Sequence, residues 1–119
     1  MVTLSELRMN NWVMWQNVPV KITSPALFER TFYKIQEGRV YGIPLTPEIL
    51  QKAGFEYKEP NPVFKTGVFR KWIDVSLVAL IPENGYYSLQ ANPLCKIQYF
   101  HQLQTLYFAL TGEELQIDF

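Results

Sequence analysis

Residues 99–112, YFHQLQTLYFALTG, contain the clearest secondary-structure signal of the chain. Their apolar positions recur at helical spacing, at Tyr99, Leu103, Leu106, Tyr107 and Leu110. The Thr111-Gly112 pair that follows is typical of a helix end, because glycine readily adopts the left-handed conformation found there. The pattern predicts a C-terminal helix from about residue 99 to residue 110, with one apolar stripe against a neighbouring sheet.

Two segments near the beginning of the sequence predict strands. Residues 12–15 are apolar and aromatic, residues 18–23 are rich in β-branched side chains, and Gln16-Asn17 separates them as a turn. This arrangement predicts an N-terminal hairpin. Pro19 within the second segment indicates an edge strand or a bulge, since proline has no N–H to donate to a neighbour.

A second run of strands is predicted in the middle of the chain. Residues 72–81 alternate as one long strand, and we expect the wholly apolar face to point to the core: Ile73, Val75, Leu77, Ala79 and Ile81. The turn signal at residues 82–85 and the return at residues 86–90 predict a partner strand. Residues 94–98 and 115–119 are also candidate strands, whereas residues 56–62 are expected to form a polar loop.

One short helix is predicted near residues 46–54. Thr46 suits the N-cap, Pro47 the first helical position, and Gly54 the residue just after the helix end. Residues 24–43 stay open between helix and strand, although Ser24 before a proline could begin a short helix. Together the elements predict a single α+β domain over residues 1–119, with a curved antiparallel sheet or small open barrel and a packed C-terminal helix.

The composition limits the class of protein. The chain has 119 residues, of which 48% are hydrophobic and 18% charged, a globular composition large enough for one core. Eleven basic and eleven acidic residues balance, so a strongly basic nucleic-acid binder is disfavoured. The charge is uneven, because residues 21–71 hold nine basic and five acidic residues while residues 72–119 hold one and five.

Candidate catalytic and metal-binding residues are few. The single histidine, His101, could act as a general base, but we interpret it as a surface or capping residue on the polar flank of the helix. Cys95 is interpreted as a small buried residue, and Glu113-Glu114 as solvated carboxylates. We therefore expect no enzyme activity, no metal site and no cofactor.

Aromatic residues are the unusual feature of the composition, with three tryptophans, seven tyrosines and eight phenylalanines. The candidate interaction surface consists of Trp12, Trp15, Trp72, Tyr86 and Tyr87. The two tryptophans of the predicted hairpin face opposite sides of a strand, so at least one should lie in the core.

Other features bear on the compartment. No apolar stretch reaches the roughly 20 residues that a membrane helix needs, and the first residues do not resemble a secretory signal. A single cysteine makes no intramolecular disulfide. We expect a cytoplasmic protein without membrane contact.

Three segments resemble a group of small uncharacterised proteins of anaerobic gut bacteria and their prophages or mobile elements. They are residues 6–13 (ELRMNNWV), 43–55 (IPLTPEILQKAGF) and, most specifically, 101–115 (HQLQTLYFALTGEEL). Similar proteins commonly have glycine where Asn10 stands. The resemblance implies a bacterial or phage accessory protein and supplies no catalytic residue.

Two functional hypotheses follow from the sequence. The first is a non-enzymatic interaction or assembly module that binds a protein partner or a second copy of itself. The alternative is a nucleic-acid-binding small barrel, suggested by the positive charge of residues 21–71 together with Trp12 and Trp15.

Overall fold

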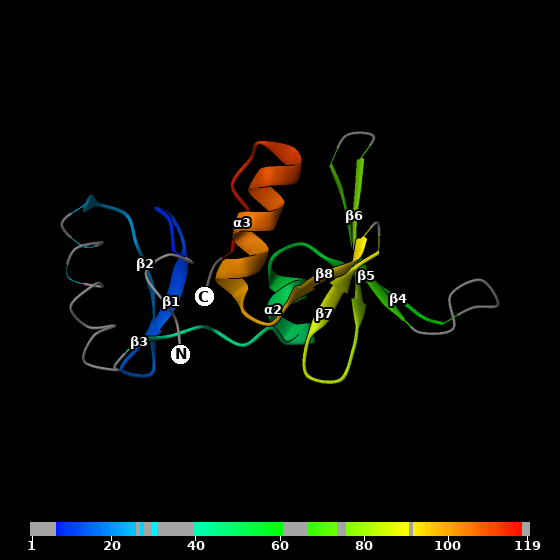
Figure 1. The fold of residues 1–119 in the computed structure, drawn as a ribbon, viewed down its shortest axis with the longest axis horizontal. Helices are drawn as coiled ribbons and strands as arrows, with labels where there is room; N and C mark the ends of the chain where they lie inside the picture. Colours follow the sequence, from blue (N-terminus) through cyan, green and yellow to red (C-terminus); the bar gives the residue numbers. More distant parts are fainter. Residues whose placement is uncertain are drawn as a thin grey trace. The chain divides into compact units, whose positions relative to one another are not determined.

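The computed structural model describes residues 7–25, 27, 30, 40–60, 67–73, 76–90 and 92–117 (Figure 1). The chain divides into two compact units. Unit 1 consists of Met1–Pro44 and Tyr99–Glu114, and unit 2 consists of Leu45–Gln98 and Leu115–Phe119. Each unit contains helix and antiparallel sheet, and neither described sheet closes into a barrel, which confirms the α+β class. The assignment of residues 1–119 to a single domain stays a prediction.

The sheet of unit 1 has three strands in the order β2-β1-β3. They are β1 (Trp12–Trp15), β2 (Val18–Lys21) and β3 (Val40–Tyr41). Gln16 and Asn17 both have positive φ angles, 51° and 63°, as the type I′ two-residue hairpin turn requires. The predicted N-terminal hairpin is therefore confirmed, and Pro19 lies on the edge strand β2.

The C-terminal helix is α3 (Phe100–Thr111), and Gly112 ends it at φ 74°, with its N–H donating to the Phe108 carbonyl at 2.8 Å. The helix is confirmed, but its predicted apolar stripe is partly wrong, because Leu110 is 52% exposed. The buried face instead comprises Phe100, His101, Leu103, Gln104 and Tyr107. Two polar residues belong to it, and spacing of apolar residues alone does not reveal such a face.

The sheet of unit 2 is an antiparallel meander of five strands in the order β4-β5-β6-β7-β8. The strands are β4 (Glu56–Lys58), β5 (Val68–Ile73), β6 (Ser76–Pro82), β7 (Tyr87–Leu89) and β8 (Asn92–Ile97). The partner strand predicted at residues 86–90 and the strand predicted at residues 94–98 are confirmed as β7 and β8.

Four predictions about unit 2 are wrong in whole or in part. Residues 72–81 do not form one strand, because Trp72 on β5 pairs with Leu77 on β6 and the chain reverses between them. The predicted core face is only partly right, because Ala79 on it is buried but Leu77 is 40% exposed, while Val78 and Leu80 of the other face are buried. Val75 of the predicted face lies outside the described residues. Residues 56–58 of the predicted polar loop form strand β4, which pairs with β5. Residues 115–117 of the predicted last strand have no strand structure, and residues 118–119 lie outside the described residues.

The short helix is confirmed as α2 (Pro47–Lys52). The Thr46 hydroxyl accepts a hydrogen bond from the Ile49 N–H at 3.2 Å, as an N-cap does. Gly54 follows the helix end with φ 93°. Lys71 on β5 donates its Nζ to the Ala53 carbonyl at 3.0 Å, which ties the end of α2 to the sheet.

The ambiguous segment at residues 24–43 is described in part. The Ser24 hydroxyl accepts a hydrogen bond from the Leu27 N–H at 3.1 Å, which agrees with Ser24 as an N-cap. Residues 26, 28–29 and 31–39 lie outside the described residues, so the choice between helix and strand stays open there.

Candidate functional site

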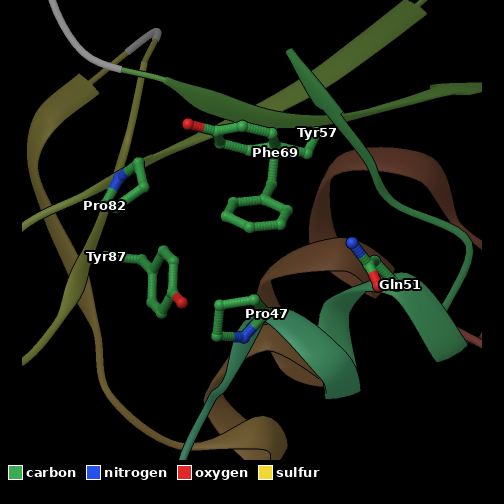
Figure 2. Close-up of a pocket in the computed structure, with 6 residues that line it drawn as sticks. All are labelled: Pro47, Gln51, Tyr57, Phe69, Pro82 and Tyr87. Atoms are coloured by element: carbon green, nitrogen blue, oxygen red, sulfur yellow. The ribbon is translucent and has the colours of Figure 1, made fainter. Parts of the chain in front are cut away.

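The candidate site is a pocket of about 350 Å³ in unit 2. It is lined by two prolines, three aromatic residues and one glutamine: Pro47, Gln51, Tyr57, Phe69, Pro82 and Tyr87. Figure 2 shows their side chains around one shared space. The volume lies at the lower end of the roughly 300–1,000 Å³ that is usual for ligand pockets.

Strand pairing places four of these residues on one face of the sheet. Tyr57 on β4 lies opposite Phe69 on β5, and Pro82 on β6 lies opposite Tyr87 on β7. Phe69 itself lies opposite Leu80, two residues from Pro82, and residues two apart on a strand share a face. Helix α2 supplies the remaining two residues, Pro47 at its first position and Gln51 one turn later.

The three aromatic rings form a row in which Phe69 contacts both Tyr57 and Tyr87. The Tyr57 and Phe69 ring centroids are 5.0 Å apart at 49°, and those of Phe69 and Tyr87 are 6.0 Å apart at 78°. Phe69 and Tyr87 are buried, whereas Tyr57 is 43% exposed. Because tilted and edge-on contacts at these distances are favourable, the rings form a pre-ordered wall, with its exposed end at Tyr57.

The Tyr57 ring lies directly against the backbone of Gly67. A Cβ atom placed on Gly67 would overlap the Tyr57 ring and hydroxyl, so only glycine at this buried position leaves room for the ring. The aromatic wall therefore depends on a glycine as well as on its three rings.

The polar groups of the pocket are neutral. They are the Gln51 amide and the hydroxyls of Tyr57 and Tyr87, and the described lining contains no charged side chain. Burial raises the pKa of the Tyr87 hydroxyl above its ordinary value of 10.0, so this hydroxyl stays protonated at neutral pH. The pocket can hold an apolar group and make a few uncharged hydrogen bonds, and its described lining offers no carboxylate, thiol or imidazole for catalysis.

The residues of the sequence-predicted interaction surface are divided between the two units. Trp12 and Trp15 lie half-buried on β1, and Trp15 packs against the unit 1 core of Leu7, Val13, Ile22 and Val40. Trp72 on β5 of unit 2 is 56% exposed. Tyr87 lines the pocket, and the half-buried ring of Tyr86 lies 5.1 Å from Lys96 Nζ. One common surface for all five residues stays a prediction.

The other five residues of the pocket were not predicted from the sequence. Pro47 was recognised only as a helix-start residue, and Tyr57 was placed in a loop. The alternation of Glu56, Tyr57 and Lys58 was the available signal for strand β4, but three residues are too short a pattern to decide.

His101 is not on a polar flank, so that interpretation is wrong. Its side chain is 0% exposed, and its ring stacks on the Tyr99 ring with centroids 5.8 Å apart at 6°. Tyr99 in turn lies against Gly42, where a Cβ atom would be 2.6 Å from the tyrosine ring. The residue thus belongs to the packing of unit 1. Cys95, expected to be buried, is half-buried in unit 2.

Glu114 is not simply solvated, contrary to the prediction. Its two carboxylate oxygens accept hydrogen bonds from Arg8 at 2.8 and 3.1 Å. The same guanidinium donates to the backbone carbonyl of Gln104 at 3.0 Å and lies 4.9 Å from the centre of the Phe108 ring. Sequence separation hides this contact, because Arg8 and Glu114 lie 106 residues apart.

Across the described residues, no group of three or more histidine, cysteine or acidic side chains could hold a metal ion. No described helix is long and apolar enough to cross a membrane. The chain matches no protein-family model, and neither the curated proteins nor the solved structures contain a significant match.

Proposed function

We propose that this chain is a non-enzymatic protein-interaction module, and that the pocket of unit 2 is its contact site. The supporting observation is the wall of three mutually contacting rings that ends at the exposed Tyr57. Aromatic residues in a preformed depression are typical of the residues that contribute most to protein interfaces.

The chemistry of the lining supports a binding role. Phosphoryl or carboxylate ligands are normally held by cations, and the described lining has only neutral groups. A peptide side chain, by contrast, needs apolar contact and one or two hydrogen bonds for its backbone. The lining supplies both, through its rings and through Gln51 and Tyr87.

The resemblance of residues 101–115 to proteins of gut bacteria and prophages suggests the setting. We place the module in a bacterial cytoplasm, as an accessory protein encoded by a prophage or mobile element. Its partner could be another protein or a second copy of the chain, and light scattering distinguishes the two.

The test is selection from a random peptide library displayed on phage, with the full chain immobilised. Tyr57→Ser removes the exposed ring of the pocket. Tyr41→Ser is the matched control, because Tyr41 is 54% exposed on β3 of unit 1 and does not line the pocket. We expect peptides that bind the parent and the control but bind Tyr57→Ser at least about tenfold more weakly.

Two outcomes would overturn the proposal. One is that no peptide is enriched, and the other is that enriched peptides bind Tyr57→Ser as well as the parent. Labelled single-stranded DNA and RNA at low salt form a separate arm. Salt-dependent binding there, without any peptide binding, would instead favour the nucleic-acid hypothesis.

A further inference from the structure

Resting on the proposed function, we infer that the pocket recognises an extended, proline-containing peptide in the polyproline II conformation, flanked by a basic residue. Three properties of the pocket lead to this ligand class: the ring-built walls, the neutral hydrogen-bond donors and the acidic residue that follows Pro47.

The walls match proline rings in shape and polarity. Five of the six lining residues carry rings, and the faces of Tyr57, Phe69 and Tyr87 meet at angles of 49° and 78°. Figure 2 shows Pro47 and Pro82 beside these rings. Aromatic-lined depressions suit polyproline II segments, because the stiff peptide loses little conformational entropy when it packs its rings against them.

The polar groups match the backbone of such a peptide. A polyproline II segment has no internal hydrogen bonds, and each proline has a carbonyl but no N–H. The ligand therefore presents acceptors and needs donors. Gln51 supplies an exposed amide N–H₂ at the rim, and the Tyr87 hydroxyl supplies a second donor.

Charge favours a basic flank on the peptide. Glu48 directly follows Pro47 in the first turn of α2, and its side chain is exposed. The Glu83 carboxylate is directed elsewhere, because it accepts a hydrogen bond at 3.3 Å from the hydroxyl of Ser88, which lies on the face of β7 opposite Tyr87. Lys58, beside Tyr57, pairs with Glu56 at 3.6 Å, which offsets its charge. An arginine or lysine next to the prolines of the ligand would gain from Glu48.

The experiment is an NMR titration of the ¹⁵N-labelled full chain with capped peptides. The first peptide, acetyl-Arg-Ala-Pro-Pro-Ala-Pro-Pro-Ala-amide, is compared with one in which every proline is alanine, and with one in which glutamate replaces arginine. We expect the proline peptide to bind at least about tenfold more tightly than the all-alanine peptide. The glutamate peptide should bind more weakly than the arginine peptide, and the Gln51 side-chain amide signals should shift on binding.

Variants show whether binding occurs at the pocket. Tyr57→Ser should weaken binding about tenfold, whereas Tyr41→Ser should not. Gln51→Ala is a second variant that leaves the core intact, because Gln51 is exposed on α2. It should weaken binding severalfold while the rest of the spectrum stays unchanged.

The failure of this inference can be separated from that of the proposed function. Equal binding of the proline and all-alanine peptides, or binding that ignores both Tyr57→Ser and Gln51→Ala, overturns the inference. If library peptides need Tyr57 but contain no proline, the interaction module stands and the proline ligand is wrong. A trimethyllysine peptide that binds more tightly than the proline peptide would identify a cation-binding aromatic cage instead.

Discussion

Replacing Gln104 by leucine should destabilise unit 1 although leucine is the more apolar residue, because the Gln104 side chain makes two hydrogen bonds to the backbone that leucine cannot make. The Gln104 side chain is 1% exposed on α3. Its Oε1 accepts from the Trp12 N–H at 2.7 Å, and its Nε2 donates to the Asn10 carbonyl at 2.8 Å. One side chain thus connects the helix to the segment that begins β1, where Asn10 has a positive φ of 71°.

The expected cost follows from the two backbone groups that lose this partner. A buried polar group deprived of its hydrogen bond costs about 1–3 kcal/mol, and leucine of similar size avoids most of a cavity. Since leucine also gains apolar burial, we expect a net loss of about 2–4 kcal/mol in the free energy of unfolding. With a urea m-value of about 2 kcal/mol/M, the middle of the usual range, the midpoint should fall by about 1–2 M.

The assay is urea unfolding followed by tryptophan fluorescence in a Trp72→Phe background. That substitution leaves Trp12 and Trp15, both in unit 1, as the only fluorescent tryptophans. Gln116→Leu is the matched control, because it makes the same chemical change at an exposed position. It should change the free energy of unfolding by less than about 0.5 kcal/mol. If Gln104→Leu behaves like this control, the side chain does not connect α3 to β1 as argued.

Three further outcomes are expected in unit 2. Thr46→Ala should cost about 1 kcal/mol of stability, since it removes the hydroxyl that caps α2, and an unchanged urea midpoint would contradict this role. Gly67→Ala should cost about 1–3 kcal/mol by pushing on the Tyr57 ring, and this cost should disappear in a Tyr57→Ala background; simple additivity in that double-mutant cycle would refute the contact. Burial raises the pKa of Tyr87, so stability that is present below pH 10 should be lost as the pH rises further. Tyr87→Phe should weaken this alkaline loss of stability, which urea midpoints between pH 9 and about 11 would measure.

Local signals in the sequence predicted several elements correctly. The N-terminal hairpin, α2 and the end of α3 depend on turn and capping residues a few positions apart, such as Gln16-Asn17, Thr46 and Gly112. The physical reason is that hydrogen bonds of caps and tight turns lie within one or two turns of the chain. Such interactions can be recognised without knowing the fold.

Predictions of which side of a strand or helix is buried were less accurate. The run at residues 72–81 alternates regularly, and its apolar composition conceals the chain reversal between β5 and β6. The buried face of α3 includes His101 and Gln104, which hydropathy assigns to the outside. A polar residue can lie inside when a partner distant in sequence satisfies it, as Asn10 and Trp12 do for Gln104.

The candidate site belongs almost wholly to the tertiary structure. Its six residues come from five elements, and the sequence contains no motif that relates Pro47 to Tyr57, Phe69 or Tyr87. The amino-acid sequence by itself determined the α+β class, the capped helices, the hairpin and the abundance of aromatic side chains. Strand pairing decided which aromatics meet, because the register of β4 to β7 places them on one face while their distance along the chain does not.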